Sequence, residues 1–447
     1  MSGDTLPALS AALAAGRAGA RALLERHLAA IDDPQGEGAR AFLSLDRAAA
    51  QASADGQDLL WREQRAASPL AGLAISIKDL FDVAGEVTTG GSVVLKNRSP
   101  AAKDAIVVAR LRAAGAIPFG RTNMTEFAFS GIGWNPHYGT PLNPYERSKR
   151  RVPGGSTSGG AVAVADFMCA ASLGSDTGGS TRLPAALCGL VGFKPTQRRI
   201  PREGVLPLST TLDSIGPIGR SVACCALVDA AIAGEPIRVP AAEPLAGRRF
   251  LVPRTYMLDE LDSWVAEAFG RAIERLAAAG AIITEASVAP LDDLPEINRL
   301  GSFSAPEAAY HHRAVLSLPG TPIDHRVRLR IERSSGMTAV QYVELGERRR
   351  LFQQAMLAAI EPYDALLMPT SPIVAPRLEE ITEDHDFFRL NALVLRNTSA
   401  INFLDGCGLS IPCHRPGEPP VGLMLAGGPL ADSRLFALGQ SIETVLA

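Results

Sequence analysis

The sequence predicts an α/β fold in which helices are layered on a sheet. Helical and strand-like patterns alternate along the chain, which is typical of this fold class. Residues 104–115 have helical periodicity and end in glycine before the strand-like AIPFG, and residues 263–280 repeat this order before AIITEASV. The chain has 447 residues, of which 47% are apolar and 20% charged, so it can bury a large core.

The other segments fit the same fold. Residues 1–32 predict one amphipathic surface helix, because arginines interrupt its apolar residues at helical spacing. Residues 161–173 fit a buried passage from a helix into a strand, and residues 339–360 predict a helix that leads into the strand ALLMP. GLSIP and VGLMLAG predict strands that return to the sheet. Residues 290–337 have the weakest pattern and predict a helical insert or cap.

Composition argues against several classes of protein. The net charge of -3 gives no broad positive field, so neither nucleic acid nor an anionic membrane is expected as a partner. The chain has no apolar run long enough for a membrane span and no basic region before its first apolar residues. The six cysteines lack CxxC spacing and lie mostly in apolar segments, which predicts reduced core thiols in a cytoplasmic protein.

Two glycine-serine clusters are the strongest candidates for an active site. They are GGSTSGG at residues 154–160 and GSDTGGST at residues 174–181. Glycine allows positive φ and a close approach of the backbone to a ligand, and serine adds a hydroxyl with little bulk. The segment between the clusters is too apolar for a flexible linker. Ser156, Ser158 and Ser180 are therefore the candidate site hydroxyls.

Lys78 is a second candidate, since the chain has only five lysines among its 44 basic residues. It ends the apolar segment LAGLAISIK, which predicts a buried strand. Burial lowers the pKa of a lysine and can make it a base near neutral pH. The alternative is that Lys78 pairs with Asp79 or Asp82 at the strand end and extends to solvent. The serine-rich clusters elsewhere favour a catalytic role.

A serine nucleophile needs a proton acceptor, and histidine is the usual one. None of the seven histidines stands in a catalytic signature, and both the GxSxG elbow and the SxxK motif are absent. The GxxxxGK[ST] and GxGxxG motifs are absent too, which argues against a nucleotide-binding enzyme. Two interpretations are left: a serine, serine and lysine constellation, or a non-catalytic protein whose glycine loops bind an anion.

These motifs together resemble the amidase signature family of serine amidohydrolases. The resemblance rests on Lys78 after its strand, on GGSTSGG and on GSDTGGSTRLPAALCGLVGFKPT, with further matches in GRTNMTEFAFSG, NPHYGTPLNP, YDALLMPTSP and PVGLMLAG. It implies a single domain over residues 1–447 with a large, twisted, mixed and mostly parallel central sheet covered by helices on both faces. Its parts would be a helical segment at about 1–60, a signature core at about 65–220, a helical or variable insert at about 290–365 and a return to the sheet at about 365–447.

The resemblance implies roles for the proton-transfer residues. Ser180 would be the nucleophile and Lys78 the base. Ser156 lies 24 residues before Ser180, the spacing of the family, and would be the bridging serine with a cis peptide bond to Gly155. In this mechanism neutral Lys78 takes the proton of Ser156, which takes that of Ser180 as Ser180 attacks the amide carbonyl.

The resemblance also implies an oxyanion hole on the second cluster. Its donors would be the backbone N–H groups of Thr177, Gly178, Gly179 and Ser180. Asp176 and Arg182 would hold this loop in shape, and Thr157 and Ser158 would support the first cluster. Thr157 stands where most members of the family have a second consecutive serine, so a role specific to that serine is not carried over.

The function that follows is cleavage of a carboxamide C–N bond to an acid plus ammonia or an amine, with a small-molecule amide as substrate and with no metal or cofactor. Four residues lie in the segment that lines the acyl pocket in the family, with core packing as the alternative for each: Met124, Phe127, Phe129 and Trp134. The alternative within the family is the A subunit of a tRNA-dependent amidotransferase, which requires a second, different subunit as its partner. A homodimer is also open.

Overall fold

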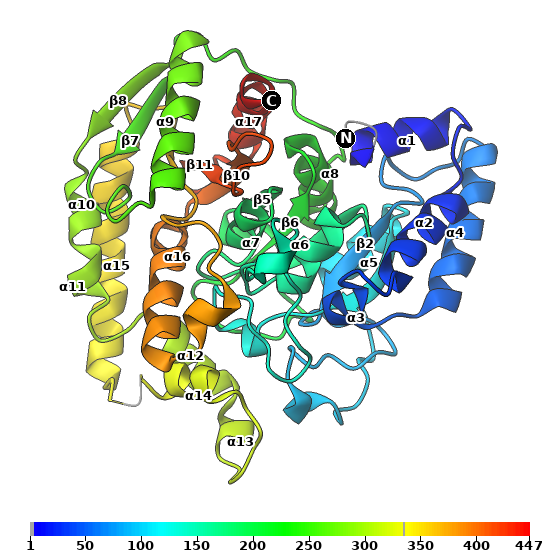
Figure 1. Ribbon diagram of the computed structural model, residues 1–447, viewed down its shortest axis with the longest axis horizontal. Coiled ribbons are helices and arrows are strands. Elements are labelled where there is room, and N and C mark those ends of the chain that lie inside the picture. Colours follow the sequence, from blue (N-terminus) through cyan, green and yellow to red (C-terminus); the bar gives the residue numbers. More distant parts are fainter. Residues whose placement is uncertain (1–3, 334–335) are drawn as a thin grey trace.

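The computed structural model describes residues 4–333 and 336–447 and contains one 11-stranded sheet. The strands follow the order β1-β3-β2-β4-β6-β5-β10-β11-β9-β7-β8 across it. Figure 1 shows how the sheet runs through the middle of the molecule. The strand bounds are β1 Phe42–Ser44, β2 Ala74–Lys78, β3 Ile117–Thr122, β4 Ala171–Asp176, β5 Val191–Lys194, β6 Ser214–Gly219, β7 Arg249–Pro253, β8 Ile282–Ala286, β9 Ala365–Pro369, β10 Cys407–Pro412 and β11 Gly422–Gly427.

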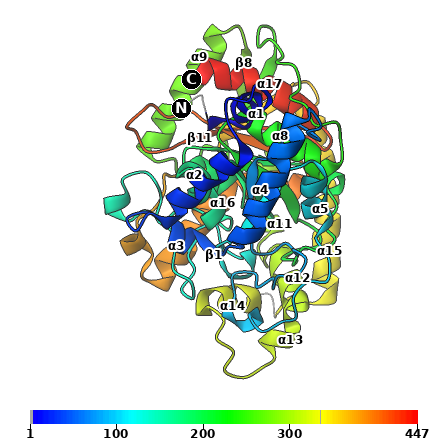
Figure 2. The same ribbon diagram turned by 90° about the vertical axis from the view of Figure 1, so that its right-hand side faces the viewer.

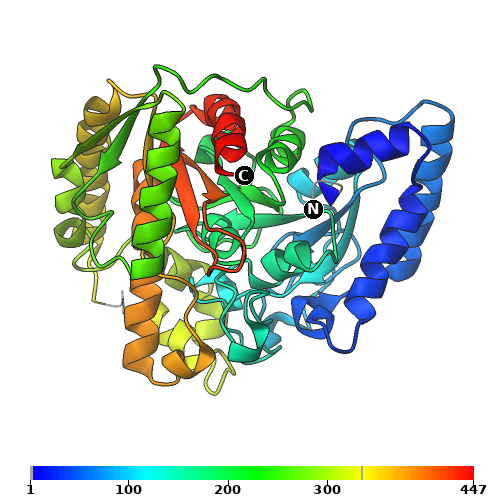
Figure 3. The same cartoon turned by 45° about the horizontal axis from the view of Figure 1, so that its top comes forward.

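Helices cover both faces of this sheet, as predicted. On one face α5, α8, α17 and α9 follow one another, and on the other α6, α7, α16 and α15 do so (Figures 1 and 3). The helix bounds are α1 Leu6–Ala14, α2 Ala20–Asp32, α3 Gly38–Ala41, α4 Arg47–Arg62, α5 Ile106–Ala113, α6 Ser158–Ala165, α7 Arg182–Leu187, α8 Val222–Ala233, α9 Ser263–Ala278, α10 Ala289–Asp292, α11 Leu294–Ile297, α12 Ser304–His311, α13 Arg313–Leu316, α14 His325–Glu332, α15 Ala339–Ile360, α16 Asp384–Leu404 and α17 Asp432–Leu446.

The sheet is mixed, as expected, but the expectation that most of its strand pairings are parallel is wrong. Among the described strands four pairings are parallel and six antiparallel. A parallel neighbour needs a crossover that runs back along the sheet, usually as a helix. The chain between β5 and β6 has no such helix, and β10 and β11 are joined by a loop alone, so these pairs are antiparallel.

Helix boundaries follow the start signals of the sequence. The α9 helix begins after Asp262, whose carboxylate accepts a hydrogen bond from the Val265 N–H. The α15 helix begins with a capping box between Thr338 and Gln341. Both helices, and the strands β8 and β9 that follow them, lie where the periodicity predicts.

The N-terminal prediction of one helix is wrong, because α1 and α2 are two separate helices that Figure 2 shows beside α4. The break lies at Gly16, which has a φ of 65°, and Gly19 stands just before α2 begins. A glycine is favoured at positive φ, where other residues are strained, so the chain turns here instead of continuing the helix. The two helices pack their leucines inward, including Leu6 and Leu24.

Three further features of the described residues concern the cysteines, membrane-spanning helices and groups of metal-ligating side chains. All six cysteines are free thiols, as predicted, and five of them are buried. Within residues 4–333 and 336–447, no helix combines the length and the apolar character that a membrane crossing needs. In the same ranges, no three histidine, cysteine, aspartate or glutamate side chains are grouped as metal ligands would be.

Candidate active site

Lys78 is the last residue of β2, at the carboxyl end of two parallel strands, β2 and β4. Its side chain is fully buried, and Nζ donates hydrogen bonds to Ser156 Oγ at 2.7 Å and to Ser175 Oγ at 2.9 Å. Burial lowers the pKa of Lys78 to about 7, although the charges of Asp176 and Asp213 act in the opposite direction. The neutral amine is therefore well populated near neutral pH. The alternative of a solvated strand-end lysine is wrong.

Ser156 stands just before α6 and is fully buried. The peptide bond between Gly155 and Ser156 is cis, as the resemblance implied, and the Ser156 carbonyl accepts a hydrogen bond from the Thr125 N–H at 3.1 Å. A Cβ atom on Gly155 would lie 2.7 Å from the Gly133 backbone nitrogen. Only glycine fits this close approach, so the glycines of the first cluster let Ser156 reach Lys78.

Ser180 lies on the second cluster and is 4% exposed, at the wall of a cavity. The Thr157 N–H donates to the Ser180 carbonyl at 3.3 Å, so the two glycine-serine clusters lie side by side. The structure thus brings Lys78, Ser156 and Ser180 into one region. Thr157 and Ser158 are fully buried beside it, and Ser158 Oγ donates to the Asn123 carbonyl at 3.5 Å.

The loop between β4 and α7 wraps around the Asp176 carboxylate. Oδ1 accepts a hydrogen bond from the Gly179 N–H at 2.9 Å, and Oδ2 accepts from the Thr181 N–H at 3.2 Å. Gly179 has a φ of 138°, which only glycine adopts readily. Among the described residues the N–H groups of Thr177, Gly178 and Ser180 have no protein acceptor. The N–H of Gly179, by contrast, is already bound to Asp176.

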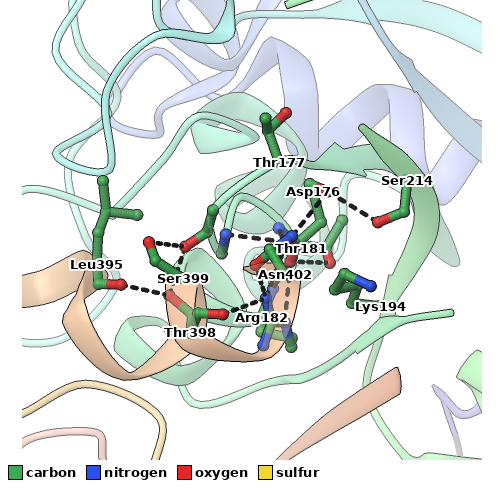
Figure 4. Close-up of polar contacts among 12 residues, drawn as sticks. Asp176, Thr177, Thr181, Arg182, Lys194, Ser214, Leu395, Thr398, Ser399 and Asn402 are labelled. Atoms are coloured by element: carbon green, nitrogen blue, oxygen red, sulfur yellow. Dashed lines mark hydrogen bonds and ion pairs between the residues drawn. The ribbon is translucent and has the colours of Figure 1, made fainter. Parts of the chain in front are cut away.

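Arg182 binds the Asp176 carboxylate through two nitrogen atoms, and Figure 4 shows the two side chains together. Its Nε donates to Asp176 Oδ2 at 3.0 Å and its Nη2 to Asp176 Oδ1 at 2.9 Å, and both side chains are fully buried. Burial alone would raise the pKa of Asp176, but the Arg182 guanidinium outweighs it and holds that pKa well below its usual range. Asp176 is therefore charged at neutral and at mildly acidic pH.

Side chains of the α16 helix bind the same loop (Figure 4). Thr398 Oγ1 and Ser399 Oγ donate to the Gly178 carbonyl at 2.6 and 3.1 Å. Asn402 Nδ2 donates to Asp176 Oδ1 at 2.8 Å, and its Oδ1 accepts from Arg182 Nη2 at 2.6 Å. The peptide unit between Gly178 and Gly179 is thus fixed at its carbonyl by α16 and at its N–H by Asp176.

Asp213 supports the loop at its first residue. Thr177 Oγ1 donates to Asp213 Oδ1 at 2.6 Å, and the N–H groups of Leu208 and Ser209 donate to Asp213 Oδ2 at 2.9 and 3.0 Å. Burial raises the pKa of Asp213 to about 6 despite these hydrogen bonds. Asp213 therefore stays charged near neutral pH and acts electrostatically on Lys78.

A cavity of about 670 Å³ is bordered by Ser180, Thr177 and Gly178. This volume is in the range of small-molecule sites. The apolar lining of the cavity includes Phe129, Leu208 and Leu294, and another part of the wall is formed by α16. Ser180 therefore faces a space that can hold a substrate.

Of the four residues predicted to line the acyl pocket, only Phe129 borders this cavity among the described residues. Met124 is fully buried under Gly91, and Phe127 is stacked on His312 with 4.1 Å between ring centroids. Trp134 packs against a separate apolar cluster. For these three the core-packing alternative holds, because the turn that contains Phe127 directs consecutive side chains in different directions.

Sequence reasoning missed several residues of the site. Ser175 stands inside the quoted motif, but nothing in the pattern indicates that it contacts Lys78. Asp213 lies in a loop with no signature, and the contacts of α16 come from a helix that was not predicted. The missed residues are Ser175, Asp213, Thr398, Ser399 and Asn402.

The family model of the amidases matches residues 22–436, which include every residue of this site. The chain belongs to the amidase family. A relative within it, a 2-amino-5-chloromuconic acid deaminase of Comamonas testosteroni, is 35% identical over 91% of this chain and 88% of its own. The A subunit of the glutamyl-tRNA(Gln) amidotransferase of Acidobacterium capsulatum is also 35% identical, over 99% of this chain and 98% of its own.

A solved amidase structure matches with a TM-score of 0.88 and 33% identity, covering 99% of this chain and 100% of that one. The fold is therefore that of an amidase signature enzyme over its whole length. Amidase membership and this match support hydrolysis of an amide C–N bond as the reaction.

Proposed function

We propose that this protein is an amidohydrolase of linear amides, with Ser180 as nucleophile and with Ser156 and Lys78 as its proton relay. One observation carries the proposal: a fully buried lysine with a pKa near 7 lies 2.7 Å from the hydroxyl of Ser156. A lysine base needs both conditions, a neutral amine and a hydrogen bond to the group it deprotonates.

In the proposed reaction neutral Lys78 accepts the proton of Ser156 while Ser156 accepts that of Ser180. Ser180 Oγ then bonds to the amide carbonyl carbon and forms a tetrahedral intermediate. The intermediate collapses when the relay returns the proton to the leaving nitrogen, which departs as ammonia or an amine. Water attacks the acyl-enzyme by the same route and releases the acid.

The negative charge of the intermediate needs donors on the Ser180 loop. The N–H groups of Thr177, Gly178 and Ser180 are suited to this, since no described protein acceptor binds them. We assign the N–H of Gly179 to the support of the loop, because it donates to Asp176. The proposed oxyanion hole therefore has three donors instead of the four expected from the sequence.

The double variant Thr398→Val and Ser399→Ala is expected to lower kcat by roughly 10-fold to 100-fold with little change in KM. Both hydroxyls fix the Gly178 carbonyl, and the loss of one oxyanion donor lowers rates by about 100-fold to 1000-fold, so misaligned donors should act more weakly. Steady-state kinetics on one amide measure the effect. Thr444→Val is the control, because the Thr444 hydroxyl bonds only within α17, to the Gln440 carbonyl. An unchanged kcat would remove α16 from the catalytic arrangement.

The rate at which an alkyl fluorophosphonate labels Ser180 is expected to rise with pH through about 7 and then level off. Below this pH Lys78 is protonated and cannot act as base, and above it the neutral amine dominates. Intact-mass spectrometry measures the labelled fraction against time, and Ser180→Ala should remain unlabelled.

Asp213→Asn tests whether the pKa of Lys78 sets the pH dependence of the labelling rate. The charge of Asp213 raises the pKa of Lys78, so its removal should move the midpoint to lower pH. A labelling rate that is flat from about pH 5 to 9 would exclude a lysine base of this kind. Absence of any label on Ser180 would favour the non-catalytic anion-binding alternative.

A second candidate function is favoured by the similarity to the A subunit of an amidotransferase, which covers 99% of this chain. In that role the chain would release ammonia from glutamine for a partner. Purification of the tagged chain from its native cells tests this: a co-purified partner, with glutaminase activity only in the complex, supports the amidotransferase. Turnover of small amides by the chain alone supports the independent amidase.

A further inference from the structure

The cavity at Ser180 is lined by an excess of positive charge. Four arginines border it, from α14, the chain after it and α16: Arg330, Arg333, Arg389 and Arg396. The single acidic residue at its wall is Glu260, whose Oε1 lies 3.7 Å from Arg396 Nη1. Arg389 pairs with Asp386 at 3.4 Å, so Arg330 and Arg333 are the two lining arginines for which the described residues show no ion pair.

Arg330 is a partly buried arginine at the wall of this cavity. Its Nη1 donates to the Phe129 carbonyl at 2.8 Å, its Cζ lies 4.5 Å from the Phe129 ring centroid, and none of the described carboxylates forms an ion pair with it. Burial and the nearby Arg333 lower the pKa of Arg330 to about 10, so it is still charged at neutral pH. A partly buried cation without a counter-charge is unfavourable unless a ligand supplies one.

Several other buried or partly buried arginines find more partners within the chain. Arg121 donates to Asp79 at 3.0 Å, and Arg182 binds Asp176 through two nitrogens. Arg220 has no carboxylate but donates to four backbone carbonyls. Arg330 has one described acceptor and borders a cavity next to Ser180. Arg110 also has one described acceptor, the Ile232 carbonyl, but it does not border this cavity, so the position of Arg330 at the cavity is what sets it apart.

We propose that the cavity binds amides that carry a carboxylate in addition to the scissile amide, with Arg330 as the anchor of that carboxylate. A guanidinium presents its N–H groups in a planar fork that matches a carboxylate. Arg333 lies three residues further and borders the same cavity, so it adds positive charge on the same side. This inference rests on the proposed function, since it assumes that the reacting amide reaches Ser180.

The test compares matched anionic and neutral ligands. One series pairs the monoamides of malonic, succinic, glutaric and adipic acid with the diamides of the same acids, which places the carboxylate on the acyl side. A second series pairs N-acetylglycine and N-acetyl-β-alanine with their amides, which places it on the amine side. Calorimetric titration of Ser180→Ala measures binding without turnover, and ammonia or amine release by the parent protein measures kcat/KM.

We expect the best anionic ligand to bind about 10-fold to 100-fold more tightly than its neutral partner. Arg330→Leu should abolish the preference for the anionic over the neutral partner, and Arg330→Lys should restore part of it. Arg350→Leu is the control, because Arg350 lies on α15, pairs with Glu347 and does not border the cavity. The ratio of the binding constants of the anionic and the neutral ligand would not change if the substitution only lowered the stability of the protein.

Equal binding of both partners, no binding of either series, or a preference that survives Arg330→Leu would each overturn the proposal. The labelling of Ser180 by a fluorophosphonate reports separately on the proposed function. A labelled protein without anion preference therefore refutes the carboxylate anchor alone, whereas an unlabelled protein refutes the amidohydrolase.

Discussion

Lys78→Met is expected to lower kcat/KM for an amide by on the order of 10⁴-fold while the melting temperature stays the same or rises. Activity falls because Lys78 Nζ is the group that hydrogen-bonds Ser156 Oγ, and methionine cannot accept a proton. Stability is retained because the buried Lys78 makes no ion pair with a carboxylate among the described residues. A methionine of similar length fills the same space without a desolvated charge.

The measurements are steady-state kinetics and calorimetric melting of the same preparations. Lys103→Met is the control, since Lys103 is exposed and the same substitution there should change neither quantity. A well-folded Lys78→Met protein that keeps about a tenth or more of the parent rate would show that another group accepts the proton. A large fall in melting temperature would instead show that Lys78 has a structural role.

The positions of the three proposed proton-transfer residues could be predicted from sequence because local constraints fix them. Lys78 ends a strand whose preceding residues are apolar except for Ser76, so its burial follows from the pattern. Ser156 and Ser180 stand in glycine clusters whose conformations few sequences can adopt, as the positive φ of Gly179 illustrates. The distance of 2.7 Å between Lys78 and Ser156, residues that are 78 positions apart, is what the structure adds.

The α16 helix escaped prediction for a physical reason. Its buried face includes Asn391, Asn397, Thr398 and Asn402, so the apolar periodicity that indicates a helix is interrupted. Asn391, Thr398 and Asn402 are buried because they bind groups of the Ser130 and Ser180 loops. Asn397 is buried because its amide donates to the Met257 and Pro369 carbonyls. The feature that hides the helix in the sequence is thus the feature that makes it part of the site.

The substrate wall could not be predicted for a related reason. Phe129 borders the cavity while Phe127, two residues earlier, packs on His312, and the positive φ of Phe127 and Ala128 separates their directions. Arg330 lies in the weakly patterned segment 290–337, and nothing in the sequence around it indicates that its side chain is buried. Which arginines line the cavity depends on the packing of α14 and α16, which are far apart in sequence.

Arg182→Met is expected to lower the free energy of unfolding by about 3 to 5 kcal/mol and to abolish activity with it. The substitution leaves the Asp176 carboxylate fully buried without its cation, and it also removes a hydrogen bond to Asn402 on α16. Urea unfolding measures the change. Arg348→Met on the exposed face of α15 is the control, because its surface pair with Glu344 contributes at most about 1 kcal/mol.

The pH dependence of stability separates this cause from simple loss of packing. In the parent protein the pKa of Asp176 lies below its unfolded value, so its contribution to stability is present above that value and is lost as pH falls through the folded pKa.

In Arg182→Met the Asp176 carboxylate is still buried, but the guanidinium that opposes the effect of burial is gone. The pKa of Asp176 should therefore rise above its unfolded value. The native state then binds more protons than the unfolded state between the two pKa values, so the deficit should shrink as pH falls through the raised pKa toward the unfolded value. Asp176→Asn combined with Arg182→Met should recover part of the loss, because no buried charge remains. A deficit that is independent of pH and additive in the double variant would show that the side chain of Arg182 stabilises the loop by packing instead of by charge.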